Sequence, residues 1–118
     1  MEAKHTPGPW VASFESVDPE WAAITTVGGS VIANVNADSR QQANAHLIAA
    51  APDMLEALRL HKAWSDSERA GPDYGGQTRD THPCGEAIWR AWWDFQLDIC
   101  ERAQKATDAA LSKAEGRS

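Results

Sequence analysis

The sequence predicts an α+β fold: an N-terminal antiparallel sheet of three or four strands packed on a proline-interrupted helix, followed by a long C-terminal helix. Three patterns support this. Apolar residues alternate with period two over residues 10–36, recur at three- and four-residue steps over residues 43–60, and form a heptad-like seam over residues 83–114. A chain of 118 residues has the length of one domain.

The first 36 residues contain an arm and the strands. Residues 1–9 include Thr6-Pro7-Gly8-Pro9, which excludes a helix and predicts an extended arm. Three strand patterns follow, over residues 10–14, 20–27 and 30–36. A turn is predicted at residues 16–19, and Gly28-Gly29 between two apolar runs is a strong hairpin signal. The short connections favour an antiparallel meander.

A helical segment is predicted over residues 38–66. Its apolar face consists of Leu47, Ile48, Ala51, Met54, Leu55 and Leu58. Pro52 lacks an N–H group and its ring clashes with the preceding turn, so two helical pieces should meet there. Asp53 favours the start of the second piece through the helix dipole. We expect this segment to cover the sheet.

A polar, glycine-containing stretch over residues 67–82 predicts a flexible loop. The final helix is predicted over residues 83–114. Its seam consists of Ile88, Trp92, Phe95, Ile99, Ala103, Ala106 and Ala110. A helix of about 30 residues is about 45 Å long, whereas a compact chain of this size is about 35 Å across. This helix should therefore overhang its domain.

The overhanging helix also carries Trp89 and Trp93 beside its seam. A wide aromatic surface in this position predicts a homodimer or higher homo-oligomer. The alternative is a monomer in which the last helix bends or breaks.

Composition excludes several classes of partner. A net charge of −6 argues against binding to a nucleic-acid duplex, which requires a basic face. No apolar run of about 18 residues is present, so no membrane association is expected. The N-terminus has no apolar core of a signal peptide, and the expected location is the cytoplasm. Cys84 and Cys100 would lie roughly 24 Å apart on one helix, too far to bridge.

No pattern of catalytic residues is recognisable: Gly-x-Ser-x-Gly, phosphate-loop and His-Glu-x-x-His motifs are missing from the sequence. His82-Pro83-Cys84 supplies two metal-capable side chains, whereas zinc requires three or four ligands. We therefore expect neither an enzyme nor a metal site nor a cofactor.

Four residues are candidates for ligand binding: Arg40, Asn44, Trp10 and Trp21. Asn44 falls on the stripe of Leu47, so its amide should be partly buried and needs a partner. That partner is the sheet backbone, a turn or a bound ligand. An arginine, an amide and aromatic rings suit a nucleotide, through phosphate pairing and base stacking. A solvated Arg40 and core packing of both tryptophans are the alternatives.

Two motifs, HTPGPW at residues 5–10 and NAHLIAAAPDMLEAL at residues 44–58, resemble a group of small accessory proteins encoded by bacteriophages and prophages. The alanine-rich stretch at residues 110–116 is similar to the usual ending of that group. The resemblance implies a phage accessory protein, and small phage proteins of this kind often counter host defence.

The predicted layout is also similar to that of the phage sponges that sequester signalling nucleotides of the Thoeris defence system. This likeness implies a non-catalytic counter-defence protein that binds a cyclic nucleotide or a cyclic ADP-ribose-type ligand. The alternative is an inhibitor that binds a host defence protein such as a CRISPR-Cas component. A third interpretation is a transcriptional or assembly accessory with no small ligand.

Overall fold

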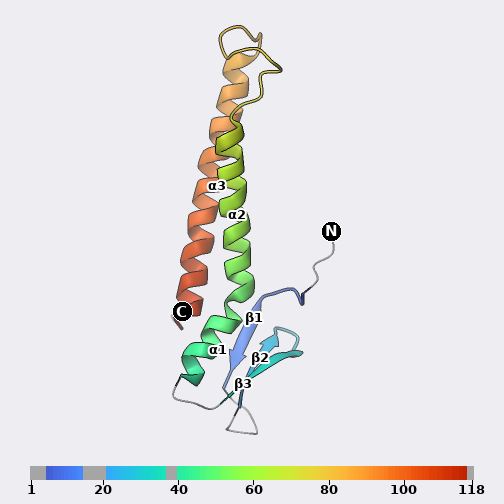
Figure 1. The fold of residues 1–118 in the computed structure, drawn as a ribbon, viewed down its shortest axis with the longest axis vertical. Helices are drawn as coiled ribbons and strands as arrows, with labels where there is room; N and C mark the ends of the chain where they lie inside the picture. Colours follow the sequence, from blue (N-terminus) through green and yellow to red (C-terminus); the bar gives the residue numbers. More distant parts are fainter. Residues whose placement is uncertain (1–4, 15–20, 37–39, 117–118) are drawn as a thin grey trace.

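The computed structural model describes residues 5–14, 21–36 and 40–116, and places a small sheet at the foot of a long helical hairpin (Figure 1). The elements in chain order are β1 (Trp10–Ser13), β2 (Trp21–Thr26), β3 (Val31–Asn36), α1 (Gln41–Ala49), α2 (Ala51–Ala70) and α3 (Gly85–Ala114). The predicted α+β class is confirmed, with three strands in the described residues. The predicted turn at residues 16–19 and the predicted helix start at residue 38 lie outside the described part.

The sheet is the predicted meander, with strand order β1-β2-β3 and antiparallel pairing throughout. Gly29 has a φ of 92°, and its N–H donates to the carbonyl of Thr26 at 3.0 Å. The backbone N–H of Ser30 donates to the hydroxyl of Thr26 at 3.1 Å. Glycine adopts this positive φ without a steric penalty, which is why the hairpin turns here.

Helix α1 covers one face of the sheet, and the main core lies between them (Figure 1). The buried core residues are Ala22, Ile24, Val35, Ala45 and Ala49. The predicted contact face of this helix was wrong: Leu47 is 51% exposed and Ile48 is 36% exposed. Alanine side chains let the helix backbone approach the sheet closely, and this contact turns the larger residues outward.

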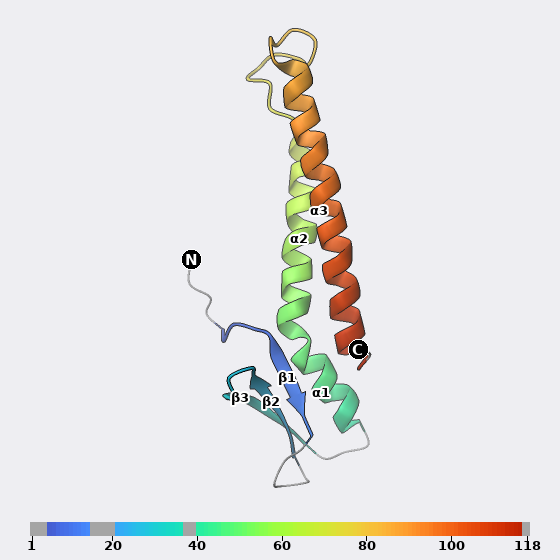
Figure 2. The same cartoon turned by 180° about the vertical axis from the view of Figure 1, so that it is seen from behind.

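The helical segment is divided near Pro52, as its missing N–H group predicted. Ala50 ends α1, its N–H donates to the carbonyl of His46 at 3.1 Å, and Pro52 occupies the first turn of α2. A missing N–H costs nothing in a first turn, because those groups have no partner within the helix. Beyond the break α2 does not cover the sheet as expected, but runs alongside α3 (Figure 2).

The α2–α3 hairpin extends the molecule to 69 Å by 28 Å by 19 Å. The radius of gyration is 20.5 Å, against roughly 13–14 Å for a compact chain of this length. The last helix extends beyond the sheet as predicted, but it does not overhang alone, because α2 lies against most of it.

The seam of the hairpin was predicted only in part. Ile99, Ala103 and Ala110 are buried as expected. Phe95 is 44% exposed, and its predicted place is taken by Gln96, which is 5% exposed. The helix face that meets α2 is rotated from the predicted seam, because one residue along a helix turns the side chain by about 100°.

Candidate functional site

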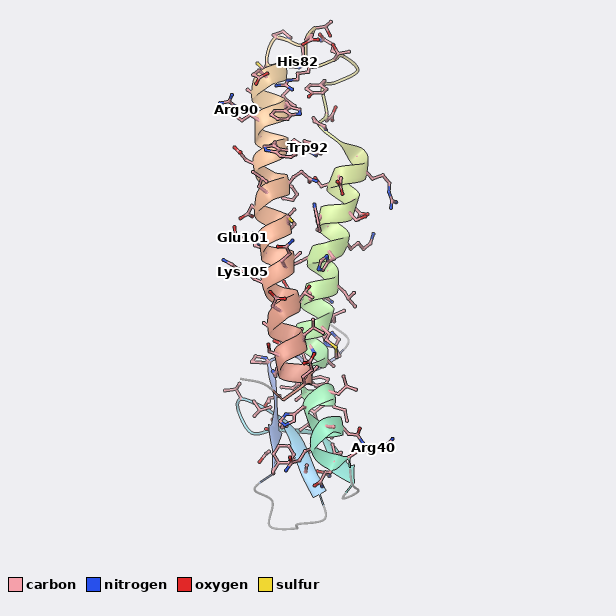
Figure 3. All side chains as sticks on the ribbon, turned by 90° about the vertical axis from the view of Figure 1, so that its left-hand side faces the viewer. Arg40, His82, Arg90, Trp92, Glu101 and Lys105 are labelled. Carbon is pink, nitrogen blue, oxygen red and sulfur yellow. The ribbon has the colours of Figure 1, made fainter. Side chains whose placement is uncertain are left out.

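The four candidate ligand-binding residues do not form one site. Arg40 precedes the first turn of α1 and is exposed, and Asn44 lies one turn further along and is exposed as well. The expected burial of Asn44 was therefore wrong. The amide that does reach the sheet belongs to Gln41, whose Nε2 donates to the carbonyl of Val35 at 3.2 Å. Figure 3 shows Arg40 at the far end of the molecule from the labelled His82.

The two candidate tryptophans are far apart in the sheet: Trp21 begins β2, and Trp10, in β1, lies opposite the other end of β2. Trp10 pairs with Thr26, and the backbone of Trp21 pairs with Asn36. The five residue steps from Trp21 to Thr26 span about 17 Å of strand. Trp10 packs against the sheet core, and its Nε1 donates to the carbonyl of Thr6 at 3.2 Å. The side chain of Trp21 lies outside the described part of the structure.

The N-terminal arm and the start of α2 together line a groove of about 480 Å³. It is lined by His5, Pro7, Gly8, Pro9, Pro52, Asp53, Leu55, Glu56 and Arg59. The arm touches α2 closely, since a Cβ added to Gly8 would lie 2.5 Å from Cβ of Pro52. A smaller hollow, bordered by Trp10 and Leu55, adjoins it. The volume suits a small ligand, and two carboxylates, of Asp53 and Glu56, line the groove together with Arg59.

The base of the hairpin is joined by polar contacts between its two helices. The hydroxyl of Thr107 donates to the carbonyl of Ala103 at 2.8 Å, and its oxygen lies 2.7 Å from Nε2 of His61. The hydroxyl has one hydrogen, so this pattern assigns the donated proton of the second bond to His61. These contacts fix α2 against α3 and engage Nε2 of His61.

One seam residue has an unmet polar atom. The Oε1 of Gln96 is buried and has no hydrogen-bond partner among the described residues. Further toward the loop, Nε1 of Trp92 donates to the carbonyl of Ser67 at 3.1 Å (Figure 3). In the seam the indole N–H of Trp92 has a hydrogen-bond partner, whereas the amide oxygen of Gln96 does not, and burying an unpaired oxygen lowers stability.

Large apolar side chains lie exposed along one flank of the hairpin. We call Leu58, Trp93, Leu97 and Leu111 the apolar stripe; their exposed fractions are 66%, 43%, 54% and 48%. At its lower end a groove of about 260 Å³ lies between the two helices. The groove is lined by Met54, Ala57, Leu58, His61, Thr107, Ala110 and Leu111. Phe95 lies on the other flank.

The tip of the hairpin is organised by Arg79. Its Nε and Nη2 both donate to Oε2 of Glu86, at 3.0 and 2.7 Å, and its guanidinium lies 4.1 Å from the ring centre of Trp89. The hydrogen bond from Arg79 lowers the pKa of Glu86, with further contributions from the charges of Arg79 and Arg90. Trp89 stacks on Trp93 at 5.7 Å. The sequence gives no local signal for these contacts.

No group of three or more metal-binding side chains occurs among residues 5–14, 21–36 and 40–116. None of the helices in this part of the chain combines the length and apolar content needed to cross a bilayer. What the described surface offers is shallow grooves and exposed apolar side chains.

Comparison with known proteins gives one result. Neither the curated proteins nor the solved structures contain a match to this chain. A family model described as Salmonella phage P22 protein Y8K6 matches residues 1–118, which is the whole chain. The chain therefore belongs to the family of Salmonella phage P22 protein Y8K6, a family of bacteriophage proteins.

Proposed function

We propose that this phage protein is a non-catalytic inhibitor that acts by binding a host defence protein. The supporting observation is the exposure of Phe95, at 44%, on the flank of the α2–α3 hairpin opposite the apolar stripe. Exposed apolar surface of this kind is typical of protein-binding sites. The net charge of −6 favours a basic partner.

The geometry favours this function over nucleotide binding, which the sequence had placed first. A phosphate needs convergent cations or backbone N–H groups. Arg40 and Asn44 lie at one end of α1, whereas Trp10 borders Pro52 beyond the other end. The apolar flanks of the hairpin need no such convergence, because a protein partner covers a broad surface.

The Phe95 flank is the surface to test for the host partner. Phe95→Lys places a charge on an exposed position, so the fold should persist while partner binding weakens roughly tenfold or more. The measurement is quantitative co-purification of host proteins from infected cells, followed by binding of the purified candidate. Leu47→Lys is the matched control, since it alters an exposed apolar residue on α1. Equal capture by both variants and by the wild type would contradict the proposal.

Sequestration of a nucleotide-derived signal is the second candidate, and the groove between the arm and α2 favours it. Its volume of about 480 Å³ lies within the range of small-molecule sites, and His5 and Arg59 line it. The test is thermal melting with a panel of cyclic nucleotides and cyclic ADP-ribose isomers, followed by recovery of the ligand after heating. A shift with intact ligand, lost in Arg59→Ala, supports a sponge. An altered ligand would instead reveal an enzyme.

A further inference from the structure

We propose that a second copy of this chain covers the apolar stripe, in an antiparallel two-fold dimer. In this dimer Trp93 of each copy enters the groove between Leu58 and Leu111 of the other. The sequence predicts an oligomer formed by the last helix. The positions of the exposed apolar residues indicate how two copies would pair. This inference does not depend on the proposed host partner.

The spacing of the stripe is self-complementary. Trp93 and Leu111 are 18 residues apart in α3, which is about five turns, so both side chains leave the helix in the same direction about 27 Å apart. A two-fold axis near residue 102 would place each residue level with the other on the partner helix. An isologous interface requires this reciprocity, in which one patch meets a second patch and the second meets the first.

The groove is suited to an indole. Its volume is about 260 Å³ and its lining is almost wholly apolar. The two polar side chains in the lining, His61 and Thr107, already bond each other at 2.7 Å. An apolar ring can therefore enter without leaving a polar group unpaired. Tryptophan is among the residues that most often carry binding energy in such a position.

Two further levels of this flank are compatible with close approach of two α3 helices. The same axis places Leu97 level with Thr107 and Cys100 level with Gln104 of the partner helix. These side chains are apolar or carry no net charge. The exposed pair of Glu101 and Lys105 lies on the outer side of α3, away from α2 (Figure 3).

The apolar stripe supplies a large part of the area that a stable dimer interface buries. At roughly 200 Å² per large apolar residue, the exposed parts of the four stripe residues amount to roughly 400 Å² in one copy and roughly 800 Å² in two. Stable interfaces bury roughly 1,200–2,000 Å², of which about 60% is apolar. The stripe thus supplies most of the apolar area that such an interface needs.

The charges of α3 favour the antiparallel direction. Residues 85–98 carry three carboxylates and one arginine, a net charge of −2. Residues 99–114 carry two carboxylates, one arginine and two lysines, a net charge of +1. An antiparallel pair sets unlike halves together, whereas a parallel pair sets like halves together.

The first test compares Trp93→Ala with Phe95→Ala by sedimentation at micromolar concentration. The two side chains are nearly equally exposed, at 43% and 44%, but lie on opposite flanks. Trp93→Ala should raise the dimer dissociation constant roughly tenfold or more, and Phe95→Ala should leave it unchanged. Since Trp93 also stacks on Trp89, Leu58→Lys provides a second variant at a more exposed position. A monomeric wild type, or equal weakening by Phe95→Ala, would overturn the proposal.

Mixing the two variants tests the pairing itself. Homodimers of Trp93→Ala and of Leu58→Lys each contain two damaged contacts. A mixed dimer restores one undamaged contact, between the Trp93 of the second variant and the Leu58 groove of the first. The mixture should therefore associate more tightly than either variant alone. No gain on mixing, with both variants folded, would contradict the reciprocal insertion of Trp93.

Discussion

The ammonium group of Lys113, in the last turn of α3, lies 2.9 Å from Oδ2 of Asp53, in the first turn of α2. Their side chains are 30% and 34% exposed, so water screens the pair only in part. Each charge also has the favourable sign for its own helix end. The pair therefore closes the open end of the hairpin, where the sheet meets the helices.

Lys113→Met should lower the free energy of unfolding by about 1 kcal/mol, because it removes this partly buried pair and the dipole interaction. Urea denaturation followed by circular dichroism measures the change. Lys105→Met is the matched control: its pair with Glu101, at 3.0 Å, is largely exposed and should matter less. Equal decreases in the free energy of unfolding would show that the Lys113–Asp53 pair stabilises the fold no more than the exposed Lys105–Glu101 pair does.

Ala49→Leu should destabilise the protein by about 1–3 kcal/mol, because a larger side chain does not fit between α1 and the sheet. Ala49 is 2% exposed and belongs to the core. The control is Ala43→Leu on the exposed side of the same helix, with an expected change within about 0.5 kcal/mol. A neutral Ala49→Leu in thermal melting would contradict the close approach of helix and sheet.

Gly8→Ala should release the N-terminal arm from α2, because the new Cβ would overlap Pro52. Limited proteolysis detects the effect as faster cleavage within residues 5–9. At Gly28 an added Cβ would meet only the Thr26 hydroxyl, at 3.8 Å, so Gly28→Ala is the control. An arm that resists cleavage equally in both variants would argue against the packing on Pro52.

Gln96→Leu should raise the free energy of unfolding by about 1 kcal/mol, since it removes a buried oxygen that has no hydrogen-bond partner. Most substitutions at buried positions lower the free energy of unfolding, so an increase in this variant would be informative. Chemical denaturation gives the answer directly. A loss of stability would mean that the amide of Gln96 has a favourable contact in the folded protein.

Glu86 should make the tip of the hairpin sensitive to acid. The bond from Arg79 lowers the pKa of Glu86 from its ordinary value of 4.5. A carboxyl group with a lowered folded pKa stabilises the fold above the unfolded pKa and loses this effect as the pH falls through the folded pKa. The melting-temperature difference between wild type and Glu86→Gln should therefore shrink below about pH 4.5. A difference that does not change with pH would contradict the ion pair.

The predictable parts of the fold depend on local patterns. Gly28-Gly29 marks a hairpin because of its backbone conformation, and Pro52 marks a helix break because of its missing N–H. The length of α3 follows from apolar spacing sustained over many turns. Each of these signals depends on neighbouring residues alone.

The wrong predictions concern which face of a helix is buried, because tertiary packing decides between two faces that the sequence makes similarly apolar. Leu47 is more apolar than Ala45, yet α1 meets the sheet through the smaller residue. Asn44 was placed on the wrong side for the same reason. In α3 the choice between Phe95 and Gln96 depends on how α2 lies against it, which the spacing along one helix does not contain. The contact of Arg79 with Glu86 and Trp89 depends on a loop that folds back on α3.

The central claim is that the apolar stripe of the hairpin binds a second copy of the chain. Sedimentation equilibrium of the wild-type protein at micromolar concentration tests this most directly. The account predicts a mass twice the 12.8 kDa of one chain, falling toward one chain in Trp93→Ala. A wild-type mass of 12.8 kDa throughout that range would contradict it.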